Sequence, residues 1–317
     1  MFRTVTITRG ETISIVDNWL IITLPDGSSM RVPVGDLYSI VLDNKLSRIS
    51  QAALTLLAQY GVHTVICDDK HLPCGVMLPL NQYYRPLTVL RKQTALLPEF
   101  KDMLWLRIVK YKLNNQRSVL SFIKANQQKI IRLEELASEV LPGDPGNREA
   151  IGAKLYFRTL FGTNFLRTND DGINACLNYG YSILRSAISR SLVAYGYNCA
   201  LGLHHIGEFN PFNLADDLIE PLRPLVDYWV DRHKEDVVET LTHDLKISLV
   251  DLVNSEVQFN GKIMKMHNAL DLYVSSLTTS IDKQDSEYFK IPILIDNYVL
   301  FLLTFFVHHL LCGIVHE

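Results

Sequence analysis

The chain has 317 residues, of which 48% are hydrophobic and 21% charged, and its formal net charge at pH 7 is −3. These values exclude a disordered or fibrous chain and indicate a globular protein long enough for two domains. The five cysteines lack the paired C-x-x-C spacing of zinc and redox motifs, and MFRTVTITRG lacks the apolar run of a signal peptide, so we expect a cytoplasmic protein with buried free thiols.

Residues 1–80 predict a small β-rich domain, arranged like a β-sandwich. Hydrophobic and polar residues alternate in the runs TVTI, WLIITL, MRVPV and LYSIVL, which is typical of short antiparallel strands. A helix is predicted next, at residues 50–61 with Ser50 as its N-cap, and another strand, HTVIC, follows it.

The pattern changes after residue 80. Pro79 and Pro86 bracket a predicted linker, residues 81–98, and beyond it apolar residues recur with helical spacing. We therefore expect an α+β protein in which the β-rich domain is followed by a larger, all-α-helical domain, residues 99–317, that contains the catalytic site.

Basic residues are concentrated in one segment. Residues 82–132 contain eleven Lys and Arg but only two acidic residues. One helix is predicted from about residue 100 to residue 132, and one of its faces has Arg107, Lys110, Arg117 and Lys124. This face is either a solvated helix side, which is the usual case, or a surface that contacts the phosphates of DNA.

The stretch GDPGNREAIGAKLYF predicts the start of a helix with Asn147 as its N-cap. Glu149 then lies in the first turn, where a carboxylate stabilises the helix macrodipole. The alternative is that Glu149 is a metal ligand that folding brings close to residues further along the chain. A long helix is predicted next, within INACLNYGYSILRSAISRSLVAYGY.

A second polar cluster lies in GLHHIGEFNPFNLADDLIEPLRP, residues 202–224. We expect its histidines on a loop and its carboxylates on a helix that begins near Asn213 or Asp216 and bends at Pro221. A bound divalent ion or Arg223 would offset the clustered negative charge, whereas an acidic first turn that only stabilises a helix is the alternative. The acidic residues are Asp216, Asp217 and Glu220, and the leucines expected on the buried side are Leu214, Leu218, Leu222 and Leu225.

Residues 291–315 are strongly apolar, but their uninterrupted run, Val299 to Val307, is too short to cross a bilayer. We expect a terminal helix that is buried in the core or against another subunit, and no membrane partner.

Three stretches together resemble a known family. NREAIGAKLYF, DGINACLNYGYSIL and GLHHIGEFNPFNLADDLIEPLRP, in this order, are similar to the universal integrase and endonuclease of CRISPR adaptation, the first-numbered Cas protein. The last stretch is most similar to the form from type II systems. The resemblance extends over essentially the whole chain, because a β-rich front and a helical body are also the layout of that family.

The resemblance implies a metal-dependent site for Mg²⁺ or Mn²⁺. Asp217 corresponds to an additional ligand or to a carboxylate that supports the ligands, and Arg223 to a residue that contacts phosphate or orients its neighbour Glu220. His204 is the rival of His205, but the spacing to Glu220 favours the latter. The catalytic residues and metal ligands implied by the resemblance are Glu149, His205 and Glu220.

The implied reaction is a transesterification that joins the 3′-hydroxyl ends of a captured double-stranded DNA fragment to CRISPR repeat DNA. The implied assembly is a homodimer, formed through the β-rich domain, that joins a small ferredoxin-like partner, the second-numbered Cas protein, in a heterohexamer; other type II adaptation proteins are further possible partners. Two alternatives stay open: a metal-dependent DNA nuclease that does not integrate, and an architectural DNA-binding subunit whose site is idle.

Overall fold

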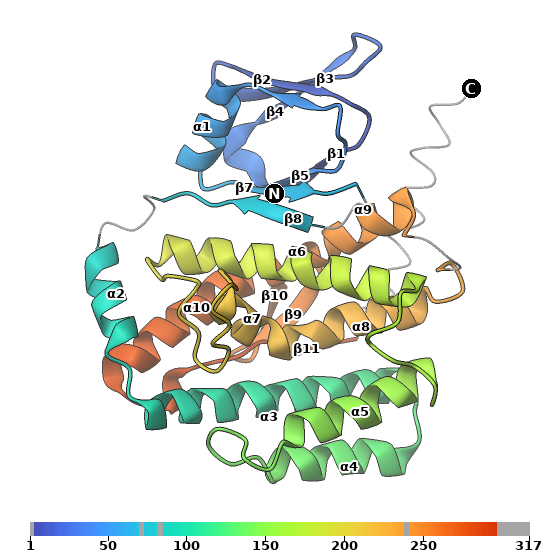
Figure 1. Cartoon of the computed structure of the whole chain (residues 1–317), viewed down its shortest axis with the longest axis vertical. Helices are drawn as coiled ribbons and strands as arrows, with labels where there is room; N and C mark the ends of the chain where they lie inside the picture. The colour runs from blue at the N-terminus through green and yellow to red at the C-terminus, as the bar shows by residue number, and fades with distance from the viewer. Residues whose placement is uncertain (1–2, 70–72, 81–84, 238–240, 297–317) are drawn as a thin grey trace.

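The computed structural model of the chain describes residues 3–69, 73–80, 85–237 and 241–296. A β-rich unit at the N-terminus is followed by a helical body, which confirms the predicted α+β class (Figure 1).

Two four-stranded sheets form the N-terminal unit, with strand orders β1-β5-β7-β8 and β4-β3-β2-β6. Ile13, Leu20, Ile40 and Leu57 are fully buried between the sheets and α1. As predicted, the Ser50 side chain caps α1 by accepting a hydrogen bond from the amide of Ala53 at 3.2 Å. The elements are β1 (Arg3–Ile7), β2 (Thr12–Val16), β3 (Trp19–Thr23), β4 (Ser29–Pro33), η1 (Val34–Asp36), β5 (Leu37–Leu42), β6 (Arg48–Ile49), α1 (Gln51–Gln59), β7 (His63–Cys67) and β8 (Pro73–Met77).

The expectation that these strands are all antiparallel was wrong. β1 pairs with β5, β5 with β7, and β2 with β6 in parallel, whereas β2-β3-β4 and β7-β8 are antiparallel. Parallel pairing requires a crossover connection, and the segment that holds β6 and α1 supplies one between β5 and β7. Hydrophobic alternation along a strand does not report the direction of its neighbours.

Two predictions for residues 81–138 are corrected. Part of the predicted linker is helical, because α2 (Pro86–Thr94) begins with proline at a position that does not need an amide hydrogen. The basic helix is two helices, α3 (Pro98–Phe122) and α4 (Gln127–Ser138), which meet at a turn where Lys124 has φ 54°. The Asn126 side chain then caps α4 by accepting from the amide of Gln128 at 2.8 Å.

The helical body is layered below the sheets (Figure 1). The long helix α6 contacts β7 and β8 on one side and α7, α8 and α10 on the other, and α3 packs against η2, α8, α4 and α5. Its remaining elements are α5 (Arg148–Phe161), α6 (Gly172–Ala194), α7 (Asn213–Ile219), η2 (Glu220–Leu222), α8 (Arg223–Arg232), α9 (His243–Asp251), η3 (Leu252–Asn254), β9 (Glu256–Phe259), β10 (Lys262–Lys265), α10 (Met266–Lys283), η4 (Ser286–Tyr288) and β11 (Ile293–Leu294).

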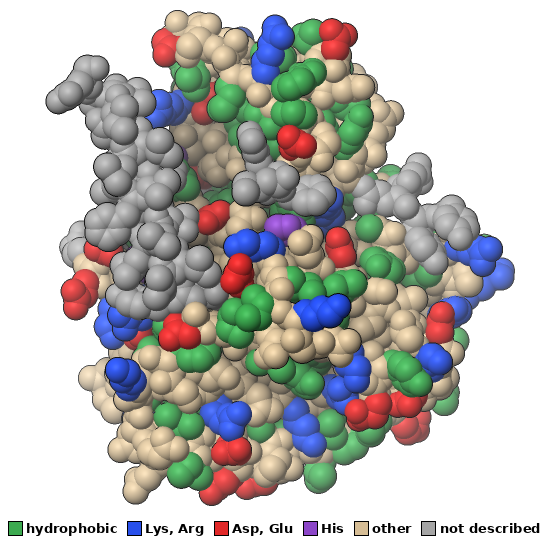
Figure 2. Space-filling view, turned by 180° about the vertical axis from the view of Figure 1, so that it is seen from behind, with side chains coloured by type: hydrophobic (Ala, Val, Ile, Leu, Met, Phe, Trp, Pro, Cys, Tyr) green, Lys and Arg blue, Asp and Glu red, His purple; other side chains and the backbone are tan. Residues whose placement is uncertain are grey.

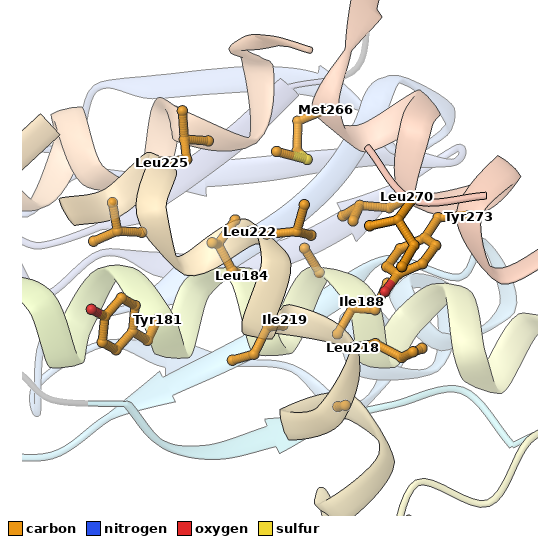
Figure 3. Packing of buried hydrophobic residues seen from close by; sticks show 14 of the residues in the cluster. Tyr181, Leu184, Ile188, Leu218, Ile219, Leu222, Leu225, Met266, Leu270 and Tyr273 are labelled. Carbon is orange, nitrogen blue, oxygen red and sulfur yellow. The ribbon is translucent and has the colours of Figure 1, made fainter. Parts of the chain in front are cut away.

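The α7-η2-α8 segment is fixed by its apolar side. Leu218 and Leu222 point toward Leu184 and Ile188 of α6 and toward Leu270 of α10 (Figure 3). All four leucines predicted to face the core, Leu214, Leu218, Leu222 and Leu225, are at most 1% exposed. The polar residues of the same segment must therefore lie on its opposite side, toward α3 and the loop that precedes α7.

The helical body also contains a small sheet that the sequence did not predict, with strand order β10-β9-β11. β11 occupies Ile293–Leu294, at the start of the apolar segment that was predicted to be helical, while residues 297–315 lie outside the described residues. Within the described ranges, no helix is both long and apolar enough to span a membrane.

Four of the five cysteines lie in the described part of the chain and are free thiols, as predicted. Cys176 and Cys199 are buried, but Cys67 is half-buried and Cys74 is exposed, which corrects the expectation that all are buried.

A buried ion pair connects the two units. Lys246 of α9 lies 3.2 Å from Asp43, which follows β5, and the two side chains are 4% and 2% exposed.

We predict that Lys246→Met lowers the free energy of unfolding by about 3 kcal/mol, because it leaves the Asp43 carboxylate buried without this cation. Denaturant unfolding measures the change. Lys45→Met, at a 3.7 Å pair whose side chains are 69% and 68% exposed, is the control and should cost less than about 1 kcal/mol; equal losses in the two variants would refute the prediction.

Candidate functional site

Two glutamates far apart in the sequence converge on one lysine. The Lys112 ammonium, in the middle of α3, donates to Oε1 of Glu149 at 2.6 Å and also to Oε2 of Glu220. Burial alone would lower the pKa of Lys112, but the charges of Glu220 and Glu149 raise it overall. The lysine is therefore held protonated between the two carboxylates.

The position of Glu149 depends on how α5 begins. Asn147 is the N-cap, as predicted, but it adopts a left-handed conformation with φ 48° and its side chain makes no capping bond. Asp144 caps the helix instead, because its carboxylate accepts from the amides of Arg148 at 2.9 Å and Glu149 at 3.0 Å. At Gly152 an added Cβ would lie 2.1 Å from Leu113, so this glycine lets α5 approach α3 closely.

Glu220 lies where the predicted helix breaks. Pro221 has no amide hydrogen, and the chain passes through η2 between α7 and α8, as the predicted bend requires. Arg223 pairs with Oε1 of Glu220 at 2.9 Å, so it orients this carboxylate, one of its two predicted roles. Burial would raise the pKa of Glu220, but the charges of Arg223 and Lys112 lower it overall, and the side chain is only 5% exposed.

His205 is oriented by Asp217. Its Nδ1 lies 2.6 Å from Oδ1 of Asp217, and because a carboxylate can only accept, Nδ1 is the protonated nitrogen and Nε2 stays available. The same fully buried carboxylate accepts from the amides of Leu203, His204 and His205. Asp217 therefore fits the predicted supporting role, since both of its oxygens are already engaged.

The loop before α7 is unusually tight. A Cβ added at Gly202 would lie 2.2 Å from the carbonyl oxygen of His205 and 3.0 Å from Oδ2 of Asp217, so no larger residue fits there without moving the backbone. The role of Gly202 was not predicted, although a glycine two residues before a pair of histidines is a signal of close backbone approach.

Trp105 contacts both adjacent histidines. It belongs to α3 and is 1% exposed. The ring of His204 stacks on it with centroids 4.1 Å apart, and the ring of His205 meets it edge-on at 5.9 Å. Asp217 contacts the ring of His205, while the ring of His204 stacks on Trp105.

Electrostatic coupling connects His205 to Glu220. The hydrogen bond that His205 donates to Asp217 raises the pKa of His205, and the charges of Asp217 and Glu220 raise it further. The side chains of His205 and Glu149 are 39% and 26% exposed, so a ligand can reach the site from their side, with Glu220 at its base.

The donor types suit a divalent cation, since two carboxylates and one imidazole nitrogen form a mixed oxygen and nitrogen set. The glutamates already converge on one positive charge. However, no group of three or more His, Cys, Asp or Glu among the described residues is arranged to hold a metal ion. The three side chains would therefore have to adjust around an ion, with Lys112 as the neighbour that is displaced.

A polar cleft adjoins Glu220. Its volume is about 260 Å³, and three of its side chains are guanidinium groups. Arg223 lies 4.9 Å over the ring of Tyr181, and Arg167 lies 5.4 Å over the same ring. The residues that line the cleft are Arg167, Asn178, Tyr181, Ser182, Arg185, Asp216, Ile219 and Arg223.

The predicted DNA-binding residues are not free on one surface. Arg107 donates to the carbonyl of Phe289 and pairs with Glu287 at 2.7 Å, and Arg117 pairs with Glu134 at 2.8 Å. Lys110 is half-buried on α3, and Lys124 is exposed in the turn after it. On the face shown in Figure 2, basic and acidic side chains are mixed. The acidic partners of Arg107 and Arg117 lie outside residues 82–132, in η4 and in the second half of α4.

Behind the cleft, Asp227 of α8 accepts a hydrogen bond from the hydroxyl of Tyr181. Burial raises the pKa of Asp227 to about 7. A carboxyl group whose pKa is raised by folding contributes stability that is fully present below its unfolded pKa, near 4, and lost as the pH rises through about 7.

We predict that Asp227→Asn, which keeps the shape but does not ionise, gains stability relative to the native chain between pH 5 and pH 8. The gain should approach about 4 kcal/mol, because one pKa unit corresponds to about 1.4 kcal/mol. Denaturant unfolding at four pH values measures the difference in the free energy of unfolding between the variant and the native chain. The contributions of the other titrating groups cancel in this difference. Asp231→Asn, about one turn further along α8, is the control; an Asp227→Asn difference that is flat with pH would contradict the prediction.

Comparison with known proteins identifies the family. The family described as CRISPR associated protein Cas1 matches residues 5–233. CRISPR-associated endonuclease Cas1 of Neisseria meningitidis serogroup C (strain 8013) is 39% identical over 293 residues, which cover 92% of this chain and 96% of that protein. The protein of the same name from Korarchaeum cryptofilum is 22% identical over 303 residues, covering 82% and 89%.

Solved structures agree on the fold. A casposase bound to its integration product superposes with a TM-score of 0.74 at 17% identity, covering 90% of this chain and 92% of that chain. A CAS1 protein from Thermotoga maritima superposes with a TM-score of 0.69 at 15% identity, covering 88% and 97%. The family match over most of the chain and the near full-length similarity to the Neisseria protein show that this chain belongs to the Cas1 family.

Proposed function

We propose that this Cas1-family chain is the spacer-acquisition integrase of a CRISPR system, in its type II form, and that its site also cleaves DNA. One observation carries the proposal: Glu149 and Glu220 converge on a single positive charge, and Nε2 of His205 is left available by the Asp217 hydrogen bond. The 3′-hydroxyl ends of a captured fragment would be joined to repeat DNA, and water in place of the hydroxyl would give hydrolysis.

Mg²⁺ or Mn²⁺ would be held by Glu149, Glu220 and His205. When bound, the ion would stabilise negative charge on the phosphoryl oxygens and favour deprotonation of the attacking hydroxyl. Asp217 fixes the ring of His205 through Nδ1, and Arg223 fixes one oxygen of Glu220. Imidazole is tolerated more readily by Mn²⁺ than by Mg²⁺, so Mn²⁺ should support the higher activity.

The arginine-lined cleft is the surface that we assign to DNA phosphates next to this site. Arg167, Arg185 and Arg223 present guanidinium groups within one hollow beside Glu220. Contacts to phosphate confer affinity without sequence preference. Of the residues first predicted for DNA binding, Lys124 is exposed in the turn after α3, and Arg107, Lys110 and Arg117 are half-buried on α3.

The assembly is proposed from relatives. One solved structure with the same fold, at a TM-score of 0.71, 18% identity and 92% coverage of this chain, is a Cas6-RT-Cas1--Cas2 complex. We propose a homodimer through the β-rich unit that joins a Cas2-like partner in a heterohexamer, and a cytoplasmic location. A nuclease that does not integrate would share the site, so strand transfer of a labelled duplex into supercoiled plasmid, with partner protein and with or without chelator, distinguishes the two.

We predict that Glu149→Gln and Glu220→Gln each abolish Mn²⁺-dependent strand transfer, because an amide does not supply the negative charge that a divalent ion requires. Asp217→Asn should lower activity by roughly 10- to 100-fold, since it weakens the support of His205. Glu135→Gln, at an exposed ion pair on α4, is the control and should be as active as the native chain. Full activity of Glu149→Gln would mean that the chemistry lies elsewhere and would favour an architectural subunit.

The arginines of the cleft should contribute to DNA affinity. Arg167→Glu and Arg185→Glu should each weaken duplex binding and make log affinity less steeply dependent on log salt, by about 0.9 for each lost phosphate contact. Fluorescence anisotropy at several salt concentrations measures both quantities. Arg132→Glu, which reverses an exposed charge on α4, is the matched control. Unchanged affinity and slope in both cleft variants would remove the cleft from the DNA path.

A further inference from the structure

Lys112 was counted in the sequence as one of many basic residues, but its surroundings set it apart. It is buried on α3, and its ammonium contacts carboxylate oxygens from two different elements, α5 and η2. Its side chain is only 10% exposed, so the ammonium cannot serve as a general surface contact for DNA. Its function therefore has to be sought in its contacts with Glu149 and Glu220, the two glutamates proposed as metal ligands.

A divalent ion and this ammonium need the same oxygens. Mg²⁺ and Mn²⁺ bind carboxylate oxygens at about 2.1 Å, and Lys112 lies 2.6 Å from Oε1 of Glu149 and within hydrogen-bond distance of Oε2 of Glu220. An ion that binds both of these oxygens would lie within a few ångströms of the ammonium. Like charges so close in a poorly solvated site repel strongly.

Of the two cations that contact Glu220, Lys112 is the one able to withdraw. Arg223 engages the other oxygen of Glu220, and its planar group is held against the ring of Tyr181 at 4.9 Å. Lysine has a compact charge on a flexible four-carbon stem, so it can leave the carboxylates without a change in the helix. Arg223 can therefore keep Glu220 oriented while Lys112 moves aside.

We propose that Lys112 is a tethered counter-cation that competes with the divalent ion for Glu149 and Glu220 and holds these two carboxylates together until the ion displaces it. The inference rests on the proposed metal-dependent function. It makes Lys112 a positioning residue that sets the affinity for the ion. Without a counter-charge, the half-buried carboxylate of Glu149 and the buried carboxylate of Glu220 would repel each other, so the lysine should stabilise the metal-free protein and weaken ion binding at the same time.

The test is a titration of the full-length protein with Mn²⁺ alone. Binding is measured by isothermal titration calorimetry and by the electron paramagnetic resonance signal of free Mn²⁺. Lys112→Met should bind Mn²⁺ with a Kd lower by roughly fivefold or more, because the competing charge is gone. Its Tm without added metal should fall below that of the native chain, and the rise in Tm on adding Mn²⁺ should be larger. A purely structural lysine would give the opposite change in Kd.

Lys112→Gln is titrated in the same way, so that the test holds if the methionine variant fails to fold. Lys92→Met, which breaks an exposed 2.6 Å pair with Asp282, is the control and should leave Kd unchanged. If Lys112→Gln or Lys112→Met binds Mn²⁺ with a Kd equal to or higher than that of the native chain, the proposed role of Lys112 is overturned, but the metal site is not. If the native chain shows no Mn²⁺ binding that is lost in Glu149→Gln, the metal site itself is overturned, and the inference with it.

Discussion

The ammonium of Lys112 between Glu149 and Glu220 is the contact on which the arrangement of the site depends. Glu149, which is half-buried, and Glu220, which is buried, would repel each other, and the pairing with Lys112 and Arg223 offsets that repulsion. Because the three partners come from α3, α5 and η2, the same interaction fixes the relative positions of these elements. Local stability and readiness to bind a cation therefore have one physical origin.

Helix α3 is the structural support of the site. It contributes Lys112 to the carboxylates and Trp105 to the histidines, and it packs against α4, α5 and η2. Gly152 allows α5 to lie close to it, and Gly202 allows the preceding loop of α7 to close over Asp217. The precision of the site thus comes from rigid packing around its polar groups, as preorganised sites require.

Each buried charge near the site has a specific partner. Asp217 accepts from three backbone amides and from His205, Asp144 accepts from the first amides of α5, and Asp227 accepts from Tyr181. Buried ionisable groups are costly unless they are paired or hydrogen-bonded. The arginines of the adjoining cleft are also partnered, since Arg185 lies 3.7 Å from Asp216 and Arg223 lies 2.9 Å from Glu220.

The sequence by itself determined the fold class, the buried leucines of the α7-η2-α8 segment and the break at Pro221, because periodicity and residue chemistry are local properties. The candidate ligands came from the resemblance of three stretches to a known family. It did not determine strand direction, the separation of α3 from α4 at Lys124, or the capping role of Asp144. Nor did it separate Lys112 from the other basic residues of its segment, or reveal that Arg107 and Arg117 have acidic partners. These depend on which residues meet across distant parts of the chain, and only tertiary packing decides that.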